Sequence, residues 1–412
     1  MQLRIGLVKI IKQIFSWVML LSLFITPSIK NFNGLFDLYW FYPIYLILIV
    51  IGIFTLKKTL VKGNKFLLFW LIIFLISTTA NLIHPYPIEN LLKQSFGFLF
   101  VGLAWFVFFK LKWLTIHETF NAYLKIAIIA AFLTIPEQIL HYNGIHLTPM
   151  KGAWLGMFRC YSICEEPFYL ALLIAPALIH LLKNLEQSKD YIILTILTIG
   201  LFFTFSGAAW LGIILYFIVK LFKQENYKQI IVSMALIIGI LSILFAYKGT
   251  QTRIKQSYEL FAYFPQIPNI QFLESQNTSS RSIYLNSVVA WQQFKLNPLI
   301  GGGIGSHKSA YEKIIIKKMP ENAIAHYNVN DGGSGLIRWI SEFGLLGIFL
   351  ILFLLKSLVL SKKNNIKEAS LSYWLIHLIH AGNFFSHGTF FWIFITKNRW
   401  FETDSNNKEG KP

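Results

Sequence analysis

The chain has 412 residues, of which 55% are hydrophobic and only 14% are charged. A soluble domain carries about 25% charged residues, so this composition excludes an ordinary soluble protein and favours a chain dissolved in lipid. The net charge of +18 would suggest nucleic-acid binding in a soluble protein, but here the basic residues gather in short loops between apolar runs, and we expect no nucleic-acid partner.

The apolar runs, taken in chain order, are long enough for membrane spans, which need roughly 20 mostly apolar residues. Ser206 and Gly207 indicate a tight hairpin between two of them. The last run is either one long span or two short halves broken near 383–388. We place the spans near 14–29, 35–56, 66–83, 92–109, 122–140, 166–182, 191–205, 207–222, 229–247, 335–356 and 371–395. The predicted fold is an all-α, polytopic membrane helix bundle of about 11 spans, within a range of roughly 10 to 12.

Lysine and arginine gather in alternate loops, which lie near 4–12, 57–65, 110–112, 220–228 and 356–367. The positive-inside rule puts these loops, and with them the N-terminus, in the cytoplasm. The first apolar run follows a basic stretch, as a signal peptide does. No small-residue cleavage site follows it, so we interpret it as a retained span.

Four regions follow from this topology. An N-terminal membrane bundle of about 9 spans covers 1–247, an extracytoplasmic loop covers 248–334, C-terminal membrane helices cover 335–396, and a polar tail covers 397–412. A loop as long as 248–334 is usually functional or disordered. Ile, Phe, Tyr and Trp occur throughout it, which favours a folded loop.

The middle of this loop predicts an amphipathic helix. Ser279 or Ser280 can cap its N-terminus, and Tyr284, Val288 and Trp291 recur at helical spacing. Pro298 ends the helix, and a glycine-rich stretch follows at 301–305. The apolar stripe indicates that the helix lies against the membrane or against the bundle.

Polar residues that can carry chemistry collect on the predicted outer side. Arg281 lies in the first turn of the loop helix, where a cation is either incidental or directed at an anion. His326 and Asn328 precede a flexible turn, and an imidazole at a water interface can titrate near neutral pH. Arg338 and Glu342 are four residues apart on one helical face, either as an interior ion pair or as functional groups.

A second outer segment ends in "RCYSICEEPFYLA", which contains Arg159 and Glu166. Proline and carboxylates suit the first turn of the helix that follows, so Glu166 is either a helix-end residue or a functional carboxylate. Guanidinium groups suit a pyrophosphate, and a carboxylate or histidine can take a proton from a hydroxyl. We therefore expect this segment and the 248–334 loop to fold over one shared site.

The sequence offers no sign of a metal or cofactor site. Its two cysteines, Cys160 and Cys164, cannot form a zinc site alone, and no Cys/His cluster surrounds them. No phosphate-binding glycine loop is present either. We predict neither a metal nor a cofactor.

Three segments together resemble the bacterial O-antigen polymerase and O-antigen ligase superfamily. "SRSIYLNSVVAWQQFKLNPLIGGGIGS" is similar to the family's arginine, aromatic helix and glycine-rich run, and "HYNVNDGGSGLIRWISEFGLLG" to its "H-x-N … E-x-G-x-x-G" block. "RCYSICEEPFYLA" resembles the "R … E-P-S-Y-L-A" segment of the polymerases, with Phe168 where serine is usual. The family often has Ser-Arg-Gly at the short hairpin. This chain has "FSGAAW", so Arg253 or Arg159 would have to supply that anion contact.

The resemblance implies a metal-independent glycosyltransferase of the bacterial inner membrane with an extracytoplasmic active site. Its donor would be an undecaprenyl-diphosphate-linked glycan, its acceptor another glycan or a lipid core, and polysaccharide-assembly proteins would be further partners. The expected catalytic residues are His326, Glu166 and Glu342. The expected substrate-binding residues are Arg159, Arg281, Asn328 and Arg338.

Three functions stay open at this point. The Glu-Pro pair at 166–167 favours a polymerase, which extends a lipid-linked glycan, over a ligase, which moves the finished chain to a lipid core or protein. A lipid or polysaccharide transporter is the alternative from another class, supported mainly by His377, His380 and His387. Transporters place polar groups at mid-membrane, whereas here they lie mostly in outer loops.

Overall fold

The computed structural model describes residues 2–25, 28–29, 38–61, 65–146, 156–182, 188–221, 231, 234–235, 237–239, 241–242, 248–319, 328–330, 332–359, 365–383 and 388–396. This part of the chain is helical except for loops and two very short strands, β1 (Ser28–Ile29) and β2 (Leu38–Tyr39), which pair antiparallel. The predicted all-α class is confirmed at this level.

The first half of the chain forms α1 (Gln2–Leu21), α2 (Tyr42–Val61), α3 (Lys65–Ile83), α4 (Ile88–Leu111), α5 (Ile116–Tyr142), α6 (Pro167–Leu182), α7 (Ser188–Phe203) and α8 (Gly207–Leu221). The predicted break between two helices at 206–207 is found, because α7 ends at Phe203 and α8 begins at Gly207. The predicted span at 229–247 falls mostly outside the described residues.

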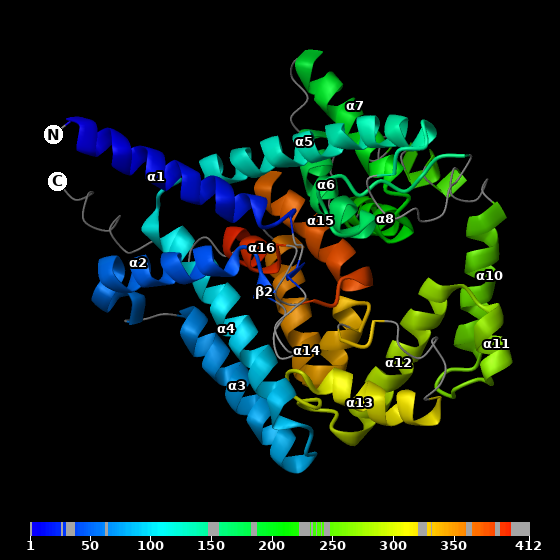
Figure 1. Cartoon of the computed structure of the whole chain (residues 1–412). Coiled ribbons are helices and arrows are strands. Elements are labelled where there is room, and N and C mark those ends of the chain that lie inside the picture. The colour runs from blue at the N-terminus through cyan, green and yellow to red at the C-terminus, as the bar shows by residue number, and fades with distance from the viewer. Residues whose placement is uncertain are drawn as a thin grey trace.

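The second half forms α10 (Lys248–Ala262), α11 (Ile270–Ser275), α12 (Thr278–Leu296), α13 (Ser306–Ile314), a 3-10 turn η1 (Ile316–Lys318), α14 (Gly335–Val359), α15 (Asn365–His380) and α16 (Thr389–Thr396). Of the two alternatives for 371–395, the broken one is found, because α15 and α16 are separate helices. In Figure 1, α14 lies near the centre of the molecule, with α3 and α4 on one side and α12 and α13 on the other.

Among the described residues, four helical segments are long and apolar enough to cross a membrane: 66–83 of α3, all of α4, all of α5 and all of α14. Shorter apolar helices occur in α1, α2, α6, α7 and α8. The outward faces of α2 and α3 expose large apolar side chains, among them Leu46, Ile53, Phe54 and Leu75. Such faces are unfavourable in water and suit contact with lipid tails.

The loop region has a small core of its own, separate from the core of the bundle. Tyr284, Leu285, Val288 and Val289 of α12 are buried in it. They pack with side chains of α10, α11, α13 and η1, which include Leu260, Leu273, Tyr311 and Ile315. The predicted helix exists and also contacts α14 of the bundle, but its apolar stripe mainly builds this loop core.

The predicted N-cap of that helix is wrong. Asn277, not Ser279 or Ser280, precedes the first turn, and its side chain accepts a hydrogen bond from the Ser279 backbone at 3.0 Å. Asparagine is at least as good a cap as serine, so the helix can begin before the two serines.

Candidate functional site

The glycine-rich loop after α12 interlocks with a kink in α14. Gly301 has φ 64° and Gly344 has φ 55°, a region that favours glycine. A Cβ atom at Gly301 would lie 2.5 Å from the Glu342 carbonyl carbon, and one at Gly344 would collide with the Pro298 carbonyl oxygen. The two glycine motifs, distant in sequence, are therefore the two halves of one tight joint.

Backbone hydrogen bonds close this joint from both sides. The amides of Gly302 and Gly303 donate to the carbonyls of Ser341 and Glu342, at 3.1 and 2.8 Å. The amides at 345 and 346 donate back to the carbonyls at 298 and 299, at 2.8 and 3.1 Å. The kink leaves α14 carbonyls without their helical donors, and the loop supplies donors in their place.

Arg338 and Glu342 form an ion pair inside the protein. The Arg338 Nε and Glu342 Oε1 atoms are 3.1 Å apart, and the two side chains are 2% and 0% exposed. The remaining guanidinium nitrogens donate to the Gly382 carbonyl at 2.8 Å and to Gln94 Oε1 at 2.9 Å. Of the two interpretations open from the sequence, the geometry is that of an interior pair, which ties α14 to α4 and to the end of α15.

A buried histidine, His307, lies beside this pair and was missed in the sequence. Its Nε2 is 2.8 Å from Asn286 Oδ1, and its Nδ1 is 2.9 Å from Ser341 Oγ. The Asn286 amide donates to the Ser282 carbonyl at 2.8 Å, which leaves its oxygen facing the ring. The His307 Nε2 therefore carries the hydrogen and Nδ1 accepts from Ser341, so a neutral ring satisfies every group.

Burial and the neighbouring Arg338 charge lower the pKa of His307 from 6.5 to about 3. The folded protein thus keeps the ring neutral while the unfolded chain takes up a proton below pH 6.5. Stability is therefore full above the unfolded pKa of 6.5 and is lost as the pH falls towards 3.

We expect this histidine alone to lower the free energy of unfolding by about 2 kcal/mol between pH 7 and pH 5. Denaturant unfolding of purified wild type and His307→Gln at both pH values measures it. The variant should lose about 2 kcal/mol less than wild type over that interval. An identical pH dependence in the two proteins would show that His307 does not titrate in this way.

A second group of polar side chains meets at Arg159. Its Nε donates to the Thr204 carbonyl at 3.2 Å. Burial and the positive charge of Arg253 lower the pKa of Arg159, while Tyr161 and Glu166 act in the opposite direction. The predicted outer segment and α10 of the 248–334 loop are therefore close enough in space for their charges to interact.

The turn before α14 lies between the two groups. The Gly332 amide donates to the Asn328 carbonyl at 3.0 Å, and a Cβ at Gly332 would lie 3.3 Å from His307 Nε2. On the other side, His380 hydrogen-bonds the Gly333 backbone and lies within reach of the Arg159 charge. Asn328 is exposed, whereas His326 falls outside the described residues.

Arg281 is buried beside the loop core, against which Val329 next to this turn also packs. It is 6% exposed, so it is not an incidental surface residue, and its Nη1 donates to the Leu273 carbonyl at 2.8 Å. Burial raises the pKa of Tyr311, and the Arg281 charge partly offsets this, so the two side chains are neighbours. Sequence reasoning also missed Glu137 and Gln138 of α5, which bind the backbone on either side of Arg159.

The described residues contain no group of three or more His, Cys, Asp or Glu side chains arranged to hold a metal ion. Both cysteines are buried and free.

Residues 192–352 match the family described as O-antigen ligase. The matched segment runs from α7 into α14 and includes Arg253, Arg281, His307, Arg338 and Glu342. Arg159 and Glu166 precede it. No curated protein matches the chain. The family match confirms the predicted resemblance over residues 192–352, a segment that contains the apolar helix α8 and most of the apolar helices α7 and α14.

Proposed function

We propose that the protein is a glycan polymerase of the bacterial inner membrane. It transfers a glycan from a polyprenyl diphosphate onto a sugar hydroxyl of another lipid-linked repeat unit. The observation that carries this proposal is that Arg159 lies near enough to Arg253 and Glu166 for the charges of both to act on its guanidinium group. Two guanidinium groups whose charges act on each other suit a doubly anionic ligand, and a bound pyrophosphate would offset their repulsion.

The transfer requires further groups besides the cations. The acceptor oxygen bonds to the anomeric carbon, the carbon–oxygen bond to the diphosphate breaks, and undecaprenyl diphosphate leaves. The hydroxyl proton passes to a base, for which we propose His326, with Glu166 as the alternative. The leaving group is already activated, so the enzyme must supply cations, a base and orientation rather than a metal.

The buried residues have supporting roles in this proposal. His307 cannot act as the base, because both of its ring nitrogens are engaged inside the protein. Glu342 is paired with Arg338, so we propose that the pair fixes the outer end of α14, which follows directly on the turn bearing Asn328. Arg281 and Asn328 remain predicted substrate contacts, with Arg281 acting from the first turn of α12.

We place the four regions in the membrane as the basic loops predict. The regions 1–247 and 335–396 supply about 11 spans, 248–334 is the extracytoplasmic loop, and 397–412 is a polar tail. With the N-terminus in the cytoplasm, Arg159 and Arg253 lie at the outer face. The family implies lipid-linked glycan substrates, and an outer site lets the glycan approach from water and the polyprenyl tail from lipid.

A ligase is the second candidate, because the matching family is described as O-antigen ligase. The test mixes purified protein with undecaprenyl-diphosphate oligosaccharide alone and separates the products by size. We expect a ladder of lipid-linked products. A ligase would form no product until a second acceptor is added. Product formation by neither route, with proton-linked movement of the lipid in vesicles, would indicate a transporter instead.

A further inference from the structure

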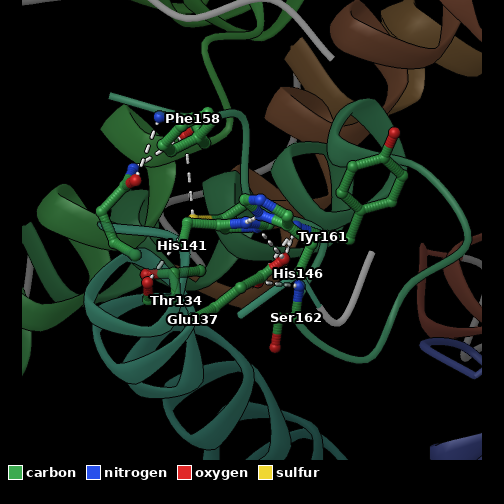
Figure 2. Close-up of polar contacts among 9 residues, drawn as sticks. Thr134, Glu137, His141, His146, Phe158, Tyr161 and Ser162 are labelled. Atoms are coloured by element: carbon green, nitrogen blue, oxygen red, sulfur yellow. Dashed lines mark hydrogen bonds and ion pairs between the residues drawn. The ribbon is translucent and has the colours of Figure 1, made fainter. Parts of the chain in front are cut away.

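The segment that carries Arg159 is bound on both sides by neighbouring side chains of α5. On one side, Gln138 binds Phe158 through both ends of its amide. The Gln138 Nε2 donates to the Phe158 carbonyl at 2.8 Å, and the Phe158 amide donates to Gln138 Oε1 at 3.0 Å (Figure 2). A two-point contact of this kind fixes both the position and the direction of the backbone just before Arg159.

On the other side, the carboxylate of Glu137 binds Tyr161 and Ser162. The Tyr161 amide lies 3.0 and 3.1 Å from the two carboxylate oxygens, and the Ser162 amide lies 2.7 Å from Oε2 (Figure 2). Ser162 has φ 53°, which turns its amide towards the same carboxylate as its neighbour. Glu137 is 5% exposed.

The two residues between these contacts are bound to α7 and the turn that follows it. The Cys160 amide donates to the Phe203 carbonyl at 2.9 Å, and the Arg159 Nε donates to the Thr204 carbonyl at 3.2 Å. The backbone from Phe158 to Ser162 is thus held at four of its five residues, and Arg159, the fifth, is anchored through its own side chain. These contacts fix the backbone on both sides of Arg159 and one nitrogen of its guanidinium group.

A carboxylate inside a membrane helix is costly, and such residues are functional candidates for that reason. Glu137 also faces His141, whose Nε2 is 3.8 Å from its Oε1, and His141 Nδ1 lies 3.0 Å from His146 Nδ1. The carboxylate nevertheless accepts hydrogen bonds from two backbone amides of the Arg159 segment, those of Tyr161 and Ser162. An acceptor-only group suits this task, because a glutamine would turn an NH₂ group towards an N–H donor.

We propose that Glu137 and Gln138 are positioning residues for Arg159. They set where its guanidinium lies relative to Arg253 and Glu166, and so how it meets the anionic leaving group. This inference rests on the proposed function, since it assigns Arg159 a role in transfer. It adds two residues of α5, outside the matched segment 192–352, to the machinery of the reaction.

The test is a double-mutant cycle on transfer rate with the lipid-linked donor. Glu137→Gln should lower the rate about 10²-fold, the loss that a misplacement of about 1 Å causes. Arg159→Lys keeps the charge but loses the planar fork, so it leaves a low, measurable rate. In the Arg159→Lys background, Glu137→Gln should lower the transfer rate by less than about threefold, because the guanidinium group that Glu137 positions is already absent.

Glu118→Gln is the matched control. Glu118 lies at the opposite end of α5, and it also accepts a backbone hydrogen bond, from the Thr115 amide at 2.7 Å. The substitution alters only a helix cap far along α5 from the Arg159 segment, where glutamine can still accept the bond, so the transfer rate should stay within about twofold of wild type. All variants are compared at equal amounts of inserted protein.

Gln138→Met is a second test of the positioning role, because it removes both hydrogen bonds with Phe158 and changes no charge. It can be measured even when the Glu137→Gln protein fails to insert into the membrane. Its effect should likewise shrink in the Arg159→Lys background. The positioning role is overturned if Glu137→Gln and Gln138→Met lower the transfer rate by the same factor in the wild-type and Arg159→Lys backgrounds. Wild-type transfer rates for both variants would overturn it as well. A wild-type rate for Arg159→Lys would instead remove Arg159 from the proposed function itself.

Discussion

Arg338→Met is expected to lower the free energy of unfolding by about 3–5 kcal/mol, because Glu342 would keep a buried charge after losing its partner. The Gly382 carbonyl and Gln94 would lose their donors as well. Denaturant titration of the purified protein in mixed micelles measures the change. The double variant Arg338→Met with Glu342→Gln should recover part of the loss, since it removes the stranded charge.

Lys308→Met is the matched control for that experiment. Lys308 and Glu312 have the same spacing of four residues, but their side chains are 42% and 46% exposed and 4.0 Å apart. Solvent screens such a pair, so its loss should cost less than about 1 kcal/mol. Equal losses for Lys308→Met and Arg338→Met would contradict the view that burial of the Arg338–Glu342 pair sets its importance.

His326→Ala is expected to lower the transfer rate by about 10²–10⁴-fold, which is the usual contribution of a general base. The turn that follows this residue is fixed between His307 and His380, and neither ring nitrogen of His307 is available for proton transfer. The rate is measured with the lipid-linked donor after normal expression and membrane insertion have been established.

Donor binding by His326→Ala separates two roles for this histidine. Intact binding with lost transfer indicates the base, and lost binding indicates a contact with the pyrophosphate. His117→Ala is the control, since His117 is an exposed histidine in the first turn of α5, at the end opposite Glu137. Wild-type glycan output from His326→Ala would remove His326 from the site altogether.

The helices of the bundle were predictable because hydropathy is a local property of the chain. The runs near 66–83 and 335–356 correspond to α3 and α14 within a few residues, and Pro167 starts α6 as a helix-initiating proline does. The spacing of Arg338 and Glu342 placed them on one helical face, since residues four apart are neighbours there, but it left open whether they form an ion pair. Each of these inferences needed only neighbours in sequence.

The support of the candidate site was not predictable in the same way. Glu137 finds Tyr161 across 24 residues, and His307 finds Ser341 across 34. The local sequence around Glu137 or His307 does not predict these partners, because the packing of other helices brings each pair together. Arg159 and Arg253 were each noticed in the sequence, but the proximity that makes them interesting depends on the fold.

During synthesis, the joint between the glycine loop and α14 can form only after residues 341–346 have been made. Towards the N-terminal half, the loop region contacts residues already synthesised: the Ile304 amide donates to Ser77 Oγ at 3.0 Å, and Asn90 donates to Ser309 Oγ at 2.8 Å. Towards the C-terminal half, four backbone hydrogen bonds join the loop to residues 341–346, which are made later. A nascent chain that stops before α14 lacks the partners of these four hydrogen bonds, so its glycine loop cannot close the joint. The glycine loop therefore reaches its final structure only once α14 has been made and has packed against it.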